Sequence, residues 1–507
     1  MPLFHIATLG CKVNQYESQS LREAWLAAGL EETRAPEQAA VILVNSCAVT
    51  AKAVADVRNA VRRLHRAAPQ AAVIVTGCAA VAMADELAAL PGVLAVVPQD
   101  RKADLKGLVP ELVTGCNESG LPPRTPPGGN DSPRTPPIQK NIAEQCFSDN
   151  AGPGPQGPGG GVRGGGAPSF PSPSSLRYPD LAVSGYERSR AVLKIQDGCS
   201  HGCAYCIVPL TRGAARSRPF AESLAEARRL LGAGFAEIVI SGVNLRQYAQ
   251  EDGGFWAFLS GLDAALAPEW AGRARLRLSS LEPGQLGDEA LAALARCRMV
   301  APHLHLSLQS GSASVLRRMG RGHYRPDTLP VFLDRLRAVW PVYGLGADIL
   351  TGFPGESDGE FEEGLRLVQG LGLTYAHVFP YSRRPGTQAA AMPGQVPQAV
   401  KKDRAARLRE TARQGKEAFL RQLAVLPELT VVFEDRDGET ARGVCEYYAD
   451  CRLGSVPAGL FDAPGHEPGQ NLARDTVREL ARGLTGVRPV GTDGETLCVA
   501  RKGGACD

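Results

Sequence analysis

The sequence DGCSHGCAYCIVPLTRGAARSR spans residues 197–218 and holds three cysteines within eight positions, Cys199, Cys203 and Cys206. A structural zinc site takes four ligands, usually in paired spacings, and no fourth cysteine lies nearby, although His201 falls between the first two. A disulfide would leave one thiol over. A 4Fe–4S cluster normally takes four thiolates. Three thiolates would leave one iron open, so the spacing favours a cluster whose vacant position binds another molecule.

This stretch directly follows the first of six segments that predict β-strands. The segments are 190–195, 236–242, 275–281, 303–309, 344–350 and 375–381, with helical patterns between them, for example at 220–231, 327–340 and 359–370. Six βα units predict a barrel or partial barrel, whose active site lies at the C-terminal ends of the strands. The three cysteines are therefore expected at that end.

Three more cysteines occupy equivalent positions near the N-terminus. Apolar runs at 3–10, 39–46, 71–77 and 93–98 alternate with helical patterns at 16–28, 51–67 and 79–90, which predicts an open parallel α/β sheet. Cys11, Cys47 and Cys78 each follow one of the first three strands. Ligands bind outside the carboxyl ends of parallel strands, so these thiols are expected to lie close together. The alternative is that each cysteine is a small residue filling a strand–helix turn.

Composition divides the rest of the chain. Residues 119–175 contain 25 glycines and prolines in 57 positions, and the sequence PRTPP occurs twice there. Such a segment predicts a disordered linker. A long helix is expected from 398 to 426, and the alternating residues 429–453 predict a hairpin with its turn at 435–439. The predicted domains are 1–115, a linker at 116–185, a barrel at 186–415 and a small β domain at 416–507.

Bulk properties restrict the function classes. The net charge is +3, no run of about 18 apolar residues exists, and the N-terminus lacks the pattern of a signal peptide. We therefore expect a cytoplasmic protein without a membrane partner. Thirteen cysteines in that compartment are expected to be ligands, catalysts or packing residues rather than disulfides.

The motif CSHGCAYC at the start of a βα barrel resembles that of the radical S-adenosylmethionine enzymes. TLGCKVNQYES, NSCAVTAKA and TGCAA, with RLSSLEP, HLHLSLQSGSASVLRRMGR and DILTGFPGES, resemble the motifs of the methylthiotransferases within that superfamily. The resemblance covers about residues 3–113 and 188–415. It implies that Cys199, Cys203 and Cys206 hold a 4Fe–4S cluster that binds S-adenosylmethionine and generates a 5′-deoxyadenosyl radical.

The resemblance also implies a second 4Fe–4S cluster, held by Cys11, Cys47 and Cys78 on a domain that can face the barrel. In this family sulfur and methyl are added together to an unactivated carbon. The resemblance therefore implies that all six cysteines are catalytic. Ser241 and Gly242, after the second barrel strand, are candidates for binding the methionine part of the cofactor. Glu282 and Gln309 end later strands and are expected at the same edge, or alternatively serve local turns.

Family members modify an adenosine beside the tRNA anticodon or an aspartate of a ribosomal protein. The segments TLGCKVNQYES and RGAARSR look most like the branch that acts on N6-threonylcarbamoyladenosine at position 37. Arginine binds carboxylates through paired hydrogen bonds, so Arg212, Arg216 and Arg218 are predicted to bind the threonylcarbamoyl carboxylate. The alternatives are that these arginines contact phosphates or one another, or that the substrate is a prenylated adenosine or the ribosomal aspartate.

The resemblance implies tRNA, an electron donor such as flavodoxin or ferredoxin, and a sulfur source as partners. The C-terminal domain should resemble a small RNA-binding β-barrel, yet residues 415–507 hold 11 basic and 15 acidic side chains. The basic helix at 401–413 is an alternative place for phosphate contacts. Rival hypotheses are an iron–sulfur electron carrier and an RNA-binding protein with structural zinc. Iron and acid-labile sulfide analysis would separate them.

Overall fold

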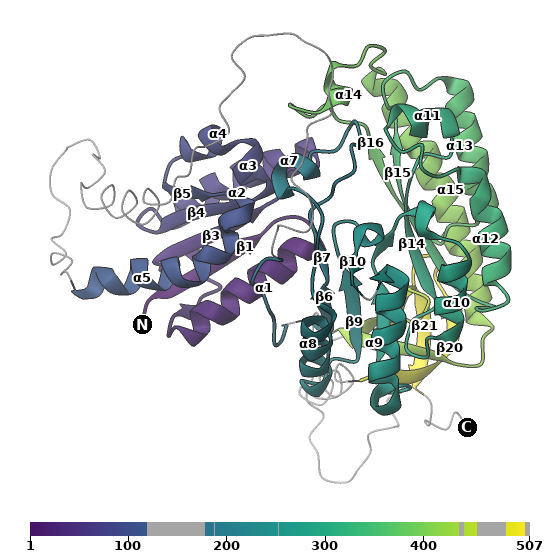
Figure 1. The fold of residues 1–507 in the computed structure, drawn as a ribbon, viewed down its shortest axis with the longest axis horizontal. Coiled ribbons are helices and arrows are strands. Elements are labelled where there is room, and N and C mark those ends of the chain that lie inside the picture. The colour runs from purple at the N-terminus through teal and green to yellow at the C-terminus, as the bar shows by residue number, and fades with distance from the viewer. Residues whose placement is uncertain (119–177, 187, 252, 435–440, 454–482, 502–507) are drawn as a thin grey trace. The chain divides into compact units, whose positions relative to one another are not determined.

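The computed structural model describes residues 1–118, 178–186, 188–251, 253–434, 441–453 and 483–501 (Figure 1). The chain forms two compact units, Met1–Val183 with Ile207–Ala214, and Ser184–Cys206 with Ala215–Asp507. Most of the predicted linker, at 119–177, and the predicted turn at 435–439 lie outside the described residues. Among the described residues, no helix combines the length and apolar character needed to cross a membrane.

The first unit contains the predicted open parallel sheet. Its strands are ordered β2 (Glu31–Glu32), β1 (Leu3–Thr8), β3 (Val41–Ser46), β4 (Ala72–Gly77) and β5 (Val93–Val97). All four pairings are parallel. Every residue of β3 is buried, as expected for a central strand covered on both faces. The edge strand β2 was not predicted, because two glutamates carry no strand signal.

Helices cover both faces of this sheet. They are α1 (Lys12–Ala27), α2 (Ala51–Ala67), α3 (Cys78–Ala82), α4 (Ala84–Ala88) and α5 (Leu105–Glu118), with 3₁₀ turns at Pro36–Gln38 and Gln99–Asp104. The helix predicted at 79–90 is two helices, because Met83 leaves helical geometry with φ −148° and ψ 38°. Thr50 starts α2 by accepting a hydrogen bond from the Ala53 amide.

Two segments place the unit boundary differently from the predicted domains. Leu181 and Val183 are buried, and the Tyr16 hydroxyl donates to the Leu181 carbonyl at 2.7 Å. These residues, predicted as linker, therefore pack on the first unit. The segment Ile207–Ala214, which contains α7 (Val208–Arg212), also belongs to this unit although the barrel surrounds it in sequence.

The second unit contains two parallel sheets that form the predicted partial barrel. One sheet comprises β6 (Arg190–Lys194), β9 (Glu237–Ser241) and β12 (Arg275–Leu278). The other comprises β13 (Ser280–Leu281), β14 (His303–Gln309), β15 (Gly344–Thr351) and β16 (Tyr375–Pro380). Strands β12 and β13, predicted as one strand, are separated by Ser279 alone. Short antiparallel pairs form between β7 (Gln196–Asp197) and β8 (Arg216–Ser217), and between β10 (Ala249–Gln250) and β11 (Gly253–Gly254).

Successive side chains of a strand point to opposite faces of the sheet. Helices cover the outer face of these strands, and the side chains on that face form the core. Leu304, Leu306 and Leu308 of β14 pack in the main hydrophobic core, whereas His303 and His305 do not. The helices are α8 (Phe220–Gly232), α9 (Phe255–Trp270), α10 (Asp288–Arg296), α11 (Ala313–Arg318), α12 (Leu329–Leu336), α13 (Asp358–Leu371), α14 (Gln388–Ala391) and α15 (Gln398–Ala424). Short 3₁₀ turns occupy Leu245–Gln247, Pro283–Gln285 and Pro326–Thr328.

A closed β-barrel completes the second unit and confirms the predicted C-terminal β domain. It comprises β17 (Leu429–Glu434), β18 (Arg442–Cys445), β19 (Asp450–Leu453), β21 (Leu497–Arg501) and β20 (Thr485–Thr492), in that order. A buried ionic cluster joins it to the larger barrel. Arg275 and Arg277 both bind Glu237, at 2.6 and 2.7 Å, and donate to the carbonyls of Thr430 and Cys445.

Candidate active site

Cys199, Cys203 and Cys206 lie in the loop that follows β6 and β7, after the C-terminal end of the first barrel strand. Neighbouring backbone fixes this loop. The amide of Ala204 donates to the carbonyl of Met319 at 2.9 Å, and the amide of Ala389 donates to the carbonyl of Ala204 at 2.8 Å. The loop is thus held both by the segment after α11 and by α14.

Hydrogen-bond donors lie beside two of these three thiols. The amide nitrogen of Asn244 is 3.7 Å from Cys199 Sγ, and Arg321 Nη1 is 3.6 Å from Cys203 Sγ. Burial raises the pKa of both thiols, and the charge of Arg321 opposes this for Cys203. Metal ligation requires thiolates, and donors to sulfur stabilise a ligated thiolate. The donor set therefore fits an iron–sulfur cluster with three cysteine ligands.

Glu282, which follows β13, is surrounded by basic side chains. Its carboxylate lies 2.8 Å from His323, 2.9 Å from Arg321, 3.5 Å from His201 and 3.6 Å from Arg246. Burial would raise the pKa of Glu282, but the hydrogen bond from His201 and the surrounding charges hold it at about 2. Glu282 therefore stays ionised and links the cysteine loop to Arg321. None of the roles of Arg321, Asn244 and His323 was predicted, although Arg321 ends the motif HLHLSLQSGSASVLRRMGR and Asn244 lies two residues after a predicted strand.

Ser241, Gly242 and Gln309 lie at the same C-terminal strand edge. Ser241 is the buried last residue of β9, and a Cβ on Gly242 would lie 2.9 Å from the Cβ of Gln196. Gln309 ends β14 with a positive φ of 59°. This position is where a barrel enzyme binds its ligands. Their binding of the cofactor stays a prediction.

The three predicted substrate arginines have carboxylate neighbours within the chain. Arg212 binds Glu17 at 2.8 Å, Arg218 binds Glu226 at 3.0 Å, and Arg216 lies 3.8 Å from Asp197. Their side chains are 3%, 5% and 11% exposed, respectively. The charges of Arg212 and Arg218 are thus neutralised by carboxylates of the same chain. Substrate binding by the three arginines stays a prediction.

The N-terminal cysteines share one edge of the parallel sheet. Cys11 is the N-cap of α1 after β1, Cys47 follows β3, and Cys78 begins α3 after β4. Burial raises the pKa of Cys47 to about 11, and the charges of Cys11 and Cys78 contribute to the increase. A Cβ on Gly10 would lie 3.2 Å from Cys47 Sγ, so the β1 turn passes directly beside that thiol. Three converging thiols, with Cys11 exposed, fit a cluster that keeps an open side.

A buried polar network supports two of these turns, those after β1 and β3. Asn14 donates to the carbonyls of Leu9 and Ser46, both at 2.9 Å, and so joins the turns after β1 and β3. In the same network, Glu17 binds Lys102 at 2.5 Å and Arg212 at 2.8 Å. Burial lowers the pKa of Lys102, which the charge of Glu17 opposes. Asn14 and Glu17 lie in the motif TLGCKVNQYES, but their partners come from distant parts of the chain, so the network could not be predicted.

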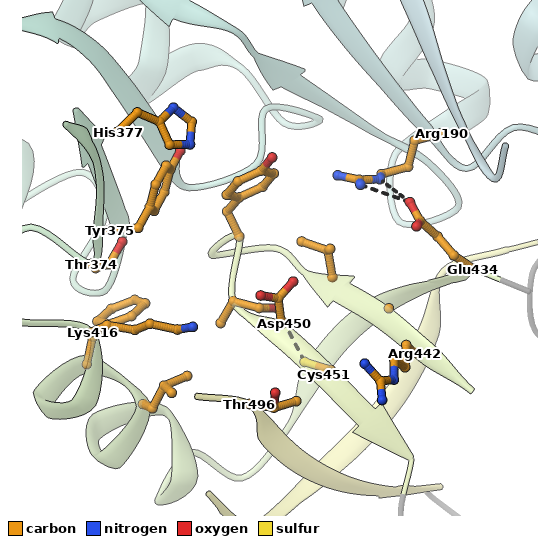
Figure 2. A pocket seen from close by; sticks show the side chains of 16 residues that line it. Arg190, Thr374, Tyr375, His377, Lys416, Glu434, Arg442, Asp450, Cys451 and Thr496 are labelled. Atoms are coloured by element: carbon orange, nitrogen blue, oxygen red, sulfur yellow. Dashed lines mark hydrogen bonds and ion pairs between the residues drawn. The ribbon is translucent and has the colours of Figure 1, made fainter. Parts of the chain in front are cut away.

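A separate pocket lies in the second unit, between β16, α15 and the C-terminal β-barrel. Its volume is about 470 Å³. Figure 2 shows His377 and Tyr375 on one side of it and Arg190 with Glu434 on the other. Lys416, Arg442 and Asp450 also line it. The lining is mostly polar and contains both charged and aromatic side chains.

Comparison with known proteins places this geometry in a family. Residues 3–98 match the group described as "Uncharacterized protein family UPF0004", and residues 193–368 match the Radical SAM superfamily. The chain is 34% identical to "Threonylcarbamoyladenosine tRNA methylthiotransferase MtaB" of Bacillus subtilis, over 80% of this chain and 78% of that protein. The protein of the same name from Chlamydia pneumoniae is 31% identical, over 88% and 90%. The chain belongs to the radical S-adenosylmethionine methylthiotransferase family.

Another relative of this methylthiotransferase carries a different name. "tRNA-2-methylthio-N(6)-dimethylallyladenosine synthase" of Novosphingobium aromaticivorans is 33% identical, over 82% of this chain and 83% of that protein. Among solved structures, the radical S-adenosylmethionine methyltransferase TsrM of Kitasatospora setae shares the fold, with a TM-score of 0.50 and 15% identity, over 77% of this chain and 75% of that chain. The chain is therefore an enzyme that transfers a methylthio group and uses S-adenosylmethionine and a 4Fe–4S cluster.

Proposed function

We propose that this methylthiotransferase modifies C2 of N6-threonylcarbamoyladenosine at position 37 of tRNA. The observation that carries the proposal is its similarity, along most of their length, to relatives named for that substrate. The prenylated-adenosine alternative is supported by relatives of similar identity.

In this proposal Cys199, Cys203 and Cys206 ligate the cluster that binds S-adenosylmethionine. When bound, this cluster supplies the electron that cleaves the cofactor to a 5′-deoxyadenosyl radical. Asn244 and Arg321 donate hydrogen bonds toward the thiolates and so stabilise their negative charge. Ser241, Gly242, Glu282 and Gln309 are assigned to the cofactor edge of the strands. The buried Glu282 acts mainly by holding Arg321 and His323 in place.

The first unit is proposed to hold a second 4Fe–4S cluster through Cys11, Cys47 and Cys78. Asn14 joins the turns that carry Cys11 and Cys47, and Glu17, Lys102 and Arg212 form a buried network with it. Because Cys11 is exposed while Cys47 and Cys78 are buried, the open side of such a cluster would lie beside Cys11. The methylthio group is assembled with sulfur from an external source and methyl from S-adenosylmethionine.

The proposal includes tRNA, an electron donor such as flavodoxin or ferredoxin, and a cytoplasmic location. Arg216 has the largest exposed fraction of the three predicted arginines. We assign it to an anionic group of the RNA, a phosphate or a carboxylate. The closed C-terminal β-barrel is assigned to RNA binding, the role expected from its resemblance to small RNA-binding barrels.

Nucleoside mass spectrometry of tRNA from a deletion strain tests this function. Loss of 2-methylthio-N6-threonylcarbamoyladenosine, restored by the wild-type gene, supports it. Loss of the prenylated methylthio nucleoside instead would assign the alternative substrate. Complementation should fail with Cys47→Ala and with Cys203→Ala. It should succeed with Cys297→Ala, a matched control whose cysteine follows α10 and belongs to neither cysteine group.

A further inference from the structure

Three polar side chains meet on the inner face of the partial barrel. His305 of β14, Asp348 of β15 and His377 of β16 alternate with core residues such as Leu306, Ala347 and Val378, whose side chains pack toward the helices. Adjacent parallel strands bring the three together, since Asp348 is in direct register with His377. The strand pattern therefore builds a polar group on the face opposite the hydrophobic core.

The three side chains are held in one arrangement. His305 Nε2 and His377 Nδ1 each lie 3.1 Å from Oδ1 of Asp348. The Tyr375 hydroxyl lies 2.9 Å from His305 Nδ1 and so fixes the ring from its other side. Burial would raise the pKa of Asp348, but the hydrogen bonds from both histidines lower it to about 2. At neutral pH the aspartate is an anion that orients two imidazoles.

Only one of the three is open to a ligand. The side chains of His305 and Asp348 are 9% and 22% exposed, whereas that of His377 is 59% exposed. Its Nδ1 is bound to Asp348, so Nε2 remains to contact another molecule. His377 also borders the 470 Å³ pocket described above, together with Tyr375, Arg190 and Arg442 (Figure 2).

We propose that His377, positioned by Asp348 and His305, binds the polar N6 substituent of the target adenosine. The inference rests on the proposed function. A threonylcarbamoyl group carries a carboxylate, a hydroxyl and N–H groups, all of which can form a hydrogen bond with the imidazole Nε2 of His377. A prenyl group would instead desolvate this nitrogen without giving it a hydrogen-bond partner, which is costly.

The dimensions agree with this assignment. His377 lies three residues before Pro380, where β16 ends, so it is about 10 Å below the strand edge at which the cofactor binds. In the adenine ring N6 lies about 3.5 Å from C2, and the threonylcarbamoyl group, a urea linkage followed by a threonine, extends about 6 to 7 Å further from N6, so the two spans together reach about 10 Å. An adenine with C2 at the strand edge can therefore direct its N6 substituent toward His377.

The test measures binding of short RNA stem-loops that carry adenosine, N6-threonylcarbamoyladenosine or N6-dimethylallyladenosine at the target position. The protein is the full chain with reconstituted clusters. In the wild type, the threonylcarbamoyl group should strengthen binding relative to plain adenosine. His377→Phe keeps an aromatic ring of similar size, and it should reduce this gain about 10- to 100-fold, as expected for a lost hydrogen bond to a charged group. His377→Asn, which keeps a polar group, should lose less.

His65→Phe on α2 is the matched control and should keep the wild-type ratio of affinities. If His377→Phe leaves the ratio unchanged, or weakens all three RNAs equally, the inference is overturned while the proposed function stands. If the wild type binds the dimethylallyl RNA more tightly than the threonylcarbamoyl RNA, the result contradicts the proposed function itself. The donor atoms of His305, Asp348 and His377 also lie within 4.8 Å of one another, close enough for a divalent metal. Stoichiometric zinc that is lost in Asp348→Asn would likewise overturn the inference.

Discussion

Replacing Arg212 with methionine separates a structural from a substrate-binding role for this residue. The guanidinium donates hydrogen bonds to Glu17 at 2.8 and 3.2 Å and to Asn14 at 2.9 Å. Methionine keeps much of the side-chain volume but removes every donor. The substitution therefore leaves a buried carboxylate with one cationic partner fewer.

The expected cost follows from what remains around Glu17. Removing one member of a buried ion pair typically costs about 3 to 5 kcal/mol. Glu17 keeps Lys102 at 2.5 Å and the Gln99 amide at 3.0 Å, so its charge is still compensated. We therefore expect Arg212→Met to lower the free energy of unfolding by about 3 kcal/mol, the lower end of this range. This corresponds to a decrease of about 6 to 12 °C in the melting temperature of the first unit.

Thermal unfolding of the full chain, followed by hydrogen exchange of peptides from α1 and α7, measures this loss. Arg63→Met is the matched control, because Arg63 is an exposed arginine on α2 of the same unit. Arg212→Met should unfold well below Arg63→Met, and its residual activity should decrease equally on all RNA substrates. Unchanged stability with activity lost only on threonylcarbamoyl RNA would refute the structural role.

Three further substitutions test other parts of the structure. Glu237→Gln leaves Arg275 and Arg277 buried without a counter-charge and should cost about 3 to 5 kcal/mol in urea unfolding. Despite burial, these arginines lower the pKa of Glu237, so its contribution to folding stability is complete above the unfolded pKa of 4.5 and declines as the pH falls below that value. The stability difference between wild type and Glu237→Gln should therefore shrink between pH 5 and pH 3. A difference that stays constant over this range would contradict the argument. Arg321→Met removes a positive charge beside Cys203 and should lower the reduction potential of that cluster by tens of millivolts in an electron paramagnetic resonance titration of a chain lacking Cys11, Cys47 and Cys78; an unchanged potential would exclude this role. Gly10→Ala would place a Cβ 2.7 Å from that of Cys47 at a φ of 115°, so the variant should lose roughly half its iron, whereas Gly29→Ala, with positive φ but open space, should keep it.

Much of the architecture could be predicted because the strands are continuous apolar runs. The predicted strands 303–309 and 375–381 correspond to β14 and β16 within one residue, and the predicted helix 51–67 is α2. The break of the 79–90 helix at Met83 and the gap at Ser279 could not be predicted, since local geometry at one residue decides both. Packing of Leu181 and Val183 on the first unit depends on a tertiary partner, Tyr16, and composition gave no sign of it.

The candidate site, too, could be predicted from the sequence only in part. Two sets of three cysteines were visible because they follow predicted strands of parallel sheets, whose ends must share an edge. The role of the basic residues was not visible, because the same guanidinium can bind a substrate carboxylate or a buried glutamate. Arg212 contacts Glu17, 195 residues away in the sequence, and only the folded chain reveals that partner.

The sequence by itself determined the chemistry: thiols placed after strands, and the family motifs around them. Only the tertiary structure decided which charges are neutralised within the fold and which remain exposed. The physical reason is that a charge buried in the protein needs a partner of opposite sign, and that partner comes from a distant part of the chain. His305, Asp348 and His377 illustrate this, because three neighbouring strands had to assemble before their side chains could meet.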